Sequence, residues 1–390
     1  GGSVGATNAL QLLADNDINQ NANITAQTAI LKADNNNDGS GALTQTQGNS
    51  ITADAVGLSA GDGGIGKAGA DTNAFDILAD TLPLETSGNA NVLDSAGGLS
   101  VVNSTAATTN ALPGETVTGN TVGGSLEIKT TGGNAAALNI QSNVQIGTNG
   151  ELVADDDIVV GGNITATGSL VLKADNDQND NGGINRNPQS PAVVTATNLG
   201  LQSSENIGDP NGTALEVNVT TLAVDTDPNT NQVGGGVNIV DNNGDLTLGT
   251  VTGVNESVAV ARSAGILKIQ ATNGNLNVGI PVTSGQGTEL GASGDLNLSS
   301  NVNAGGNFVA NAGRNINQTG NISSGGDVAL QATGNISLGG SVQATNGNTV
   351  VVAGGNLTVP SGTAVSGRTL NQVGNPTITT NQLGIQAGTD

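Results

Sequence analysis

Two short loops of the chain carry oxygen-bearing side chains at the alternating spacing that suits a calcium ion. The first loop runs Asp34-Asn35-Asn36-Asn37-Asp38-Gly39, and the second has the same rhythm over residues 177–182. In such a D-x-N-x-D-G pattern the side-chain oxygens turn toward one centre, and the glycine permits a sharp bend. The candidate calcium ligands are Asp34, Asn36, Asp38, Asp177, Asn179 and Asn181.

Both loops also have a simpler interpretation. A calcium loop is normally closed by a bidentate Glu at its twelfth position, where this chain has Gln45 in the first loop and Pro188 in the second. Loops rich in Asn, Asp and Gly are also common at the corners between strands. The pattern therefore leaves two possibilities open, a calcium site and a solvated corner.

The carboxylate run 155–157 is a second candidate for chemistry. Sugar hydrolysis needs two carboxylates at a set separation, commonly beside aromatic side chains that stack on sugars. Lyase chemistry needs a base such as Lys, Arg or His near the substrate. The chain has no His, Trp or Tyr and only nine Lys and Arg. We therefore expect no enzyme activity, and we keep a polysaccharide-processing enzyme as an alternative.

The elements that would position these groups are short strands separated by glycine corners. In residues 157–174, DIVVGGNITATGSLVLKA, apolar and polar residues alternate between the corners Gly161-Gly162 and Thr167-Gly168. Alternation over a few residues favours a half-buried strand. The side chains that we expect to point inward are Ile158, Val160, Ile164, Ala166, Leu170, Leu172 and Ala174. Three such strands bring the chain back above its start, which is one coil of a parallel β-helix.

The same coil recurs along the chain. Residues 295–312, DLNLSSNVNAGGNFVANA, match it position for position, and Ile316, Ile336 and Leu357 each follow an Asn at spacings of 20 and 21 residues. A fixed period in this range is typical of a solenoid, in which each coil buries its apolar side chains against its neighbours. The sequence therefore predicts an all-β fold, a right-handed parallel β-helix with three sides, about 20 residues per coil and corner loops.

Longer repeats are superimposed on the coils. The segment NITAQTAILKADN at 23–35 returns as NITATGSLVLKADN at 163–176, and AFDILADTLPLET at 74–86 corresponds to ALEVNVTTLAVDT at 214–226. The matched positions place Lys32 and Lys173 beside the two acidic loops, which predicts local ion pairs.

We expect one continuous domain over residues 1–390 with internal duplication. Two long repeats cover about 20–160 and 160–295, and plainer coils follow at 295–367. Segments 34–50 and 175–190, with a second matched pair at 61–71 and 203–212, are expected to be loops between coils.

Composition supports a narrow tube and excludes several partners. Phe75 and Phe308 are the only aromatic residues, there are 61 Gly, and Cys is absent. The net charge of −23 argues against nucleic acid, which needs a basic footprint. No run approaches the roughly 20 apolar residues of a membrane span. The absence of Cys excludes disulfides and thiol chemistry.

The two ends suggest continuation or self-association. Gly1 is not a natural start, and neither end shows an amphipathic helix that could cover the open strand edges. Residues 377–386, TITTNQLGIQ, still have the pattern of a strand. We therefore expect a piece of a longer fibre, or a subunit that stacks end to end on copies of itself.

The coils resemble those of filamentous-haemagglutinin-like exoproteins and large bacterial adhesins, many of which are two-partner-secretion substrates. The resemblance rests on corner-and-strand units and on L-x-A strand ends. The corner units are Gly162-Asn163-Ile164, Gly320-Asn321-Ile322, Gly334-Asn335-Ile336 and Gly355-Asn356-Leu357, and the strand ends begin at Leu172 and Leu330. The family's secretion domain typically carries NPNG- and NPNL-type motifs, whereas the nearest match here is Asp209-Pro210-Asn211-Gly212 in mid-chain. The resemblance thus implies a shaft segment and not the secretion domain.

What the resemblance implies for function is a non-catalytic shaft of an extracellular fibre or giant adhesin at the bacterial cell surface. Its expected partners are a host or neighbouring cell surface, or a glycan. The first alternative is a self-polymerising filament subunit that stacks through its coil edges, and the second is the polysaccharide-processing enzyme.

Overall fold

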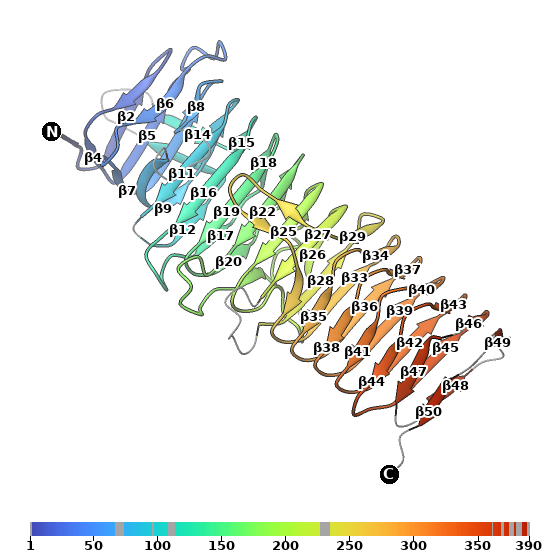
Figure 1. Ribbon diagram of the computed structural model, residues 1–390. Coiled ribbons are helices and arrows are strands. Elements are labelled where there is room, and N and C mark those ends of the chain that lie inside the picture. The colour runs from blue at the N-terminus through green and yellow to red at the C-terminus, as the bar shows by residue number, and fades with distance from the viewer. Residues whose placement is uncertain are drawn as a thin grey trace. The chain divides into compact units, whose positions relative to one another are not determined.

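The computed structural model describes residues 2–66, 74–95, 97–107, 114–226, 235–360, 362–367, 370–373, 378–379 and 384–387. Every regular element within these ranges is a β-strand (Figure 1). Contacts divide the chain into two units. The first comprises Gly1–Thr197 with Thr252–Ser257, and the second Asn198–Val251 with Val258–Asp390. The prediction of one continuous domain stays a prediction.

Three parallel sheets build the first unit, and each coil contributes one strand to each sheet. The first sheet holds β1 (Ser3–Gly5), β4 (Asn23–Thr25), the start of β7 (Ile51–Ala60), β9 (Phe75–Leu82), β12 (Leu99–Val101), β17 (Leu138–Ile140), β20 (Ile158–Val160) and β23 (Ile184–Arg186). The second holds β2 (Ala9–Leu13), β5 (Thr28–Lys32), the end of β7, β10 (Leu84–Thr86), β15 (Asn120–Val122), β18 (Val144–Ile146), β21 (Ile164–Ala166) and β24 (Val194–Thr195). The third holds β3 (Ile18–Gln20), β6 (Ala42–Gln45), β8 (Gly64–Ile65), β11 (Ala90–Asp94), β16 (Leu126–Thr130), β19 (Gly150–Ala154) and β22 (Ser169–Lys173).

The second unit has the same construction. One sheet holds β26 (Leu215–Asn218), β28 (Val237–Asp241), β33 (Leu267–Ala271), β36 (Thr288–Ala292), β39 (Phe308–Ala312), β42 (Val328–Ala332), β45 (Thr349–Ala353) and β48 (Leu370–Val373). Another holds β25 (Asn198–Gln202), β27 (Thr221–Asp225), β29 (Leu246–Leu248), β34 (Leu276–Val278), β37 (Leu296–Leu298), β40 (Ile316–Gln318), β43 (Ile336–Leu338), β46 (Leu357–Thr358) and β49 (Ile378–Thr379). The last holds β32 (Ala261–Ser263), β35 (Val282–Ser284), β38 (Val302–Ala304), β41 (Ile322–Ser324), β44 (Val342–Ala344), β47 (Ala364–Gly367) and β50 (Gly384–Ala387), and β32 also pairs with β27.

The predicted coil is confirmed at the level of single residues. Within the stretch 157–174, the expected strands are β20, β21 and β22, and Ile164 and Leu172 have no exposed surface. In the second unit Ile316 pairs in register with Ile336, which pairs with Leu357, so the period read from the sequence is the spacing of stacked coils. Phe308 is fully buried. The chain is a β-solenoid whose interior is filled mainly by Val, Ile, Leu and Ala.

The assignment of segments 34–50 and 175–190 as loops was wrong in part. Each segment contains a strand of the solenoid, β6 in the first segment and β23 in the second. Leu43 and Ile184 are the fully buried residues of these strands. One inward apolar residue among Asn and Gly gives no alternation to recognise, because a strand pattern needs several apolar residues in a row of alternating positions. Part of the second matched pair, residues 67–71, lies outside the described residues.

Asn and Gly at the corners hold neighbouring coils together. The Asn335 Oδ1 atom accepts the N–H of Asn356 at 2.7 Å, and Asn321 Oδ1 accepts the N–H of Ser341 at 3.0 Å. A Cβ on Gly320 would lie 2.1 Å from the carbonyl oxygen of Ser300 in the preceding coil. The Gly-Asn-Ile motif therefore has a physical reason, since Gly permits the close approach and Asn satisfies the next coil's backbone N–H.

Candidate functional site

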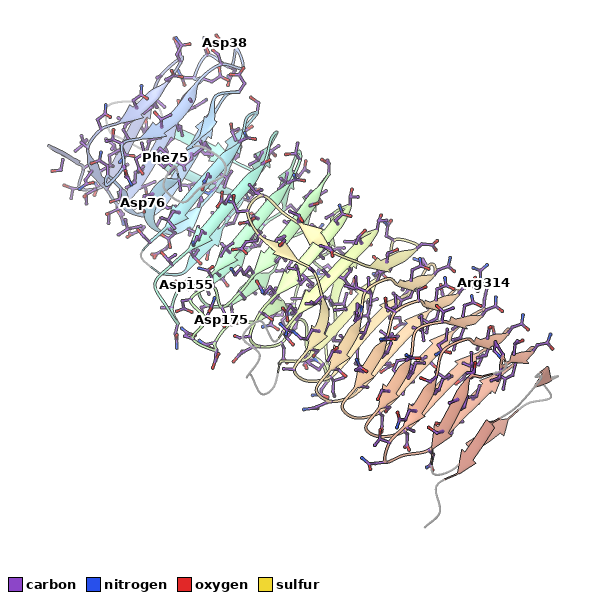
Figure 2. All side chains as sticks on the ribbon, in the orientation of Figure 1. Asp38, Phe75, Asp76, Asp155, Asp175 and Arg314 are labelled. Atoms are coloured by element: carbon purple, nitrogen blue, oxygen red, sulfur yellow. The ribbon has the colours of Figure 1, made fainter. Side chains whose placement is uncertain are left out.

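The first acidic loop satisfies its carboxylates from within. Asp34, at a φ of 61°, accepts the Gly39 N–H with both oxygens at 3.2 and 3.1 Å. Asp38, labelled in Figure 2, accepts the Ser40 N–H at 2.9 Å and the Asn36 amide at 2.9 Å. Hydrogen bonds from Ser40 lower the pKa of Asp38, because they favour the charged carboxylate.

The second acidic loop is held by a different set of contacts. Asp175, at a φ of 56°, accepts the Asn179 N–H at 2.9 Å, and Asp177 accepts the Asn179 side-chain amide at 2.7 Å. Asn181 donates to Asp156 at 3.2 Å. The six candidate ligands thus take part in hydrogen bonds that shape the two corners.

The described residues contain no group of three or more His, Cys, Asp or Glu side chains that could hold a metal ion. Asp34, Asn36 and Asp38 lie together in one loop, and Asp177 and Asn179 lie together in the other. The calcium assignment stays a prediction, since the geometry accounts for both loops as corners.

Carboxylates of the run 155–157 accept hydrogen bonds from residues at the neighbouring corners. Asp155 is buried, and it accepts the Gly132 N–H at 3.0 Å and the Asn176 amide at 3.0 Å. Asp157 accepts the Gly183 N–H at 2.7 Å. Burial, with the adjacent Asp157 charge, raises the pKa of Asp156. These contacts give Asp155 and Asp157 a structural role at the corners that they join. Asp155 is labelled in Figure 2.

An antiparallel hairpin covers the second sheet of the first unit. Its strands are β13 (Ser104–Ala107) and β14 (Glu115–Thr118). Val117 packs on Ile30, an outward-facing residue of β5 that has no exposed surface. A Cβ on Gly57 of the neighbouring β7 would lie 3.1 Å from Val117 Cγ2, so a residue without a side chain lets the hairpin lie close to the sheet.

A second hairpin tip, residues 252–257 between β30 (Val251–Thr252) and β31 (Ser257–Val258), lies on the third sheet of the first unit. Glu151 Oε2 accepts the consecutive N–H groups of Asn255 and Glu256 at 2.7 and 2.9 Å. Asn255 also donates to Glu127 at 3.1 Å, and Lys173 Nζ lies 2.8 Å from Glu256 Oε1. Charge-assisted bonds of this kind are about twice as strong as neutral ones.

The two hairpins cover residues that match in the sequences of the two long repeats. Ile30 and Val171 are matched residues of the repeat, and both are outward-facing, apolar and fully buried. A Cβ on Gly253 would lie 2.7 Å from Val171 Cγ2, so the second tip covers Val171. Because β5 lies in the second sheet and its counterpart β22 in the third, the two hairpins cover different faces.

The ion pairs predicted for Lys32 and Lys173 need correction. Lys173 pairs with Glu256, 83 residues away, and not with its acidic loop. Lys32 forms no ion pair with any residue that the structure describes. Sequence proximity misled the prediction, because the hairpin brings a distant carboxylate onto the sheet.

Two buried carboxylates escaped the sequence analysis. Asp94 accepts the Ala79 N–H at 3.1 Å, and its counterpart in the repeat, Asp241, accepts the Val219 N–H at 2.9 Å. Burial raises the pKa of Asp241. The recurrence of Asp at the end of two matched strands, NVLD and NIVD, is the signal that could have identified them.

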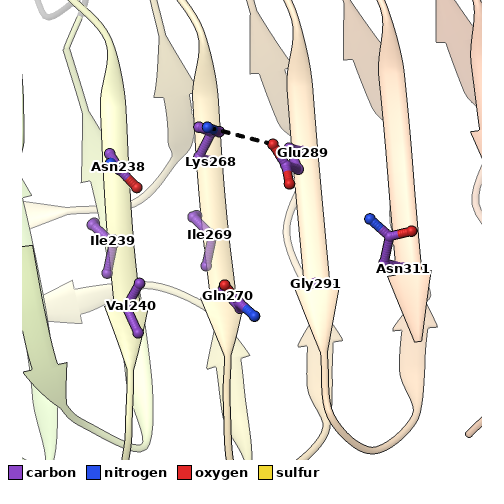
Figure 3. Close-up of a pocket in the computed structure, with 9 residues that line it drawn as sticks. All are labelled: Asn238, Ile239, Val240, Lys268, Ile269, Gln270, Glu289, Gly291 and Asn311. Atoms are coloured by element: carbon purple, nitrogen blue, oxygen red, sulfur yellow. Dashed lines mark ion pairs between the residues drawn. The ribbon is translucent and has the colours of Figure 1, made fainter. Parts of the chain in front are cut away.

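A hollow of about 160 Å³ lies on the outer face of β28, β33 and β36 (Figure 3). It forms where Gly291 interrupts a row of longer side chains between Gln270 and Asn311. Lys268 and Glu289 form an ion pair of 3.6 Å at its edge. Because both side chains of the pair are well exposed, it contributes little to stability, about 0–1 kcal/mol.

Comparison of the chain with protein-family models, curated proteins and solved structures found no match. In the part of the chain that the structure describes, no helix has the length and apolar character needed to cross a bilayer. The fold and the contacts above are therefore the basis for function.

Proposed function

We propose that the chain is a non-catalytic structural shaft, part of an extracellular fibre or giant adhesin at a bacterial cell surface. The observation that carries the proposal is a continuous ladder of corner side chains in the second unit. The ladder runs from each corner Asn or Asp oxygen to the backbone N–H one coil further on. Its members are Asp245, Asn275, Asp295, Asn315, Asn335 and Asn356.

The ladder supports a mechanical role because it repeats the same bond between successive coils from Asp245 to Asn356. Along a second row the Asn297 amide donates to Asn277 at 2.7 Å, and the Asn317 amide donates to Asn297 at 2.8 Å. Each coil is thus tied to the next through strand pairing and through side chains. The outward positions in these coils are mostly polar, which suits a surface that faces water along its length.

Immunogold electron microscopy of the native cells tests this proposal. Antibodies raised against the purified chain should label fibres that extend from the cell surface, whereas pre-immune antibodies should not. Label confined to the cell interior, or surface label without any extended structure, would contradict the shaft.

Two assays on the purified chain separate the alternatives. Concentration-dependent growth of long filaments from the chain alone would favour the self-polymerising subunit. Release of unsaturated or reducing sugars from a glycan panel would favour the polysaccharide-processing enzyme. For the shaft we expect neither result.

A further inference from the structure

A hollow of about 460 Å³ lies beside the first hairpin, over the second sheet of the first unit. Its floor is the row Lys32, Ser59, Glu85 and Thr121, which pair in register on β5, β7, β10 and β15. Thr116 and Val117 of β14 also line it. This volume falls in the range of pockets for small molecules, about 300–1,000 Å³.

The floor places an amine and a carboxylate on either side of a small residue. Neighbouring strands are about 4.8 Å apart, so the backbones of Lys32 and Glu85 lie about 9.6 Å apart with Ser59 between them. Neither charged side chain forms an ion pair with any residue in the described ranges. Lys32 and Glu85 thus place opposite charges at one hollow, with a hydroxyl between them. Asp34 also lines the hollow, and its two oxygens accept the Gly39 N–H.

In the second copy of the repeat, the residues that correspond to Lys32 and Glu85 are each paired with an oppositely charged side chain of the chain itself. There Lys173, the counterpart of Lys32, pairs with Glu256 at 2.8 Å. Asp225, the counterpart of Glu85, forms two hydrogen bonds of 2.9 Å with Arg262.

The described residues of the first copy form neither of the two corresponding ion pairs. Thr121 stands where the second copy has Arg262, so Glu85 has no matched cation. Glu115 precedes Glu256 by the same 141 residues that separate Lys32 from Lys173, but Glu115 makes no ion pair with Lys32 among the described residues. The difference between the copies is therefore a pair of opposite charges left open to a ligand.

We propose that this hollow binds a short peptide with free ends, its carboxylate beside Lys32 and its ammonium beside Glu85. An extended tripeptide spans about 10 Å, which is close to the spacing of the two strand backbones that carry Lys32 and Glu85. The hydroxyls of Ser59, Thr116 and Thr121 offer hydrogen bonds to its amides. This inference goes beyond the shaft and does not depend on it.

The charges of the floor favour a ligand that carries both a positive and a negative group. A plain anion that pairs with Lys32 leaves Glu85 without a partner, and a plain cation that pairs with Glu85 leaves Lys32 without one. A neutral ligand leaves both charges of the floor without partners. A ligand with both charges offers a partner to each of the two charged residues of the floor.

Isothermal titration calorimetry with triglycine, N-acetyl-triglycine and triglycinamide tests the proposal. We expect triglycine to bind and each capped peptide to bind at least tenfold more weakly. In Lys32→Met, triglycine and triglycinamide should bind equally, since the carboxylate has lost its partner. In Glu85→Gln, triglycine and its acetylated form should bind equally.

Lys173→Met is the matched control, because it removes the same charge from the second copy. It should leave triglycine binding unchanged, and circular dichroism should show all three variants folded. No heat with triglycine at millimolar concentration would overturn the proposal. Equal binding of capped and free peptides by the unmodified chain, or unchanged discrimination in Lys32→Met, would also overturn it.

Discussion

The hairpin-covered faces of the first unit and the plain coils of the second unit have interiors of the same kind and differ on the outside. Inward residues such as Leu172 and Leu298 are apolar and buried in both. Outward, the covered faces carry Ile30 and Val171, whereas the plain coils carry residues such as Asn317. The comparison teaches that inward residues determine the solenoid, while an apolar outward residue accompanies a hairpin that covers it.

The largest effect should come from opening a cavity in the packed interior of the second unit. Phe308→Ala removes a fully buried ring and should cost about 3–5 kcal/mol, because the stacked coils cannot collapse around the cavity. The midpoint of urea unfolding measures the loss. The neighbouring outward residue provides the control, and Val309→Ala should change stability by less than about 0.5 kcal/mol. Equal losses would mean that Phe308 is not part of a packed interior.

The next largest loss of stability should come from adding a Cβ to a glycine at a corner where neighbouring coils lie close together. Gly320→Ala would place a Cβ 2.1 Å from the Ser300 carbonyl oxygen, whereas Gly291→Ala meets the Gln270 side chain at 3.3 Å. The first change should cost about 1–3 kcal/mol, since backbone must move to relieve the overlap. The second should cost much less, because a side chain can rotate away. Unfolding midpoints compare them, and the reverse order would contradict the stacked corners.

Outward valines distinguish covered from plain faces. Val171→Ser should cost about 1–2 kcal/mol, because Val171 has no exposed surface beneath the hairpin tip. Val309→Ser lies on a half-buried outward position of β39 and should cost less than about 0.5 kcal/mol. The midpoint of urea unfolding, measured on both variants, tests whether the hairpin tip buries Val171. Two equal small losses would show that it does not.

A smaller effect is expected for one rung of the corner ladder. Asn335→Ala removes the oxygen that accepts the Asn356 N–H and should cost about 0.5–1.5 kcal/mol, the usual net worth of one hydrogen bond. Amide hydrogen exchange at residue 356 should become faster while exchange at residue 316 is unchanged. Unchanged exchange at residue 356 would show that this side chain does not protect the next coil.

The smallest expected effect is a change in how the free energy of unfolding depends on pH. Because burial raises the pKa of Asp241 above its ordinary value, the folded chain binds this proton more tightly than the unfolded chain does. Its contribution to stability is therefore present at low pH and is lost as pH rises through the folded pKa. Asp241→Asn should gain stability relative to the unmodified chain between pH 4 and pH 7. Parallel thermal melts across this range would contradict the assignment.

The strands and the inward residues could be predicted from the sequence because their rhythm is local. Ile158 to Ala174 shows its alternation within a single coil. The hairpins could not be predicted, since the burial of Ile30 depends on Val117, which is far along the chain. The partner of Lys173 was missed for the same reason. The Asn and Gly of the corners were recognised as a motif, but their role needs the neighbouring coil.

Single-cysteine labelling tests the central claim most directly, because the chain has no Cys of its own. In strand β38, thiols introduced by Val302→Cys, Asn303→Cys and Ala304→Cys should react slowly, fast and slowly. In strand β22, those from Leu170→Cys, Val171→Cys and Leu172→Cys should all react slowly, since the hairpin covers the outward position. Uniform rates along β38, or a thiol at position 171 as reactive as one at position 303, would contradict the account.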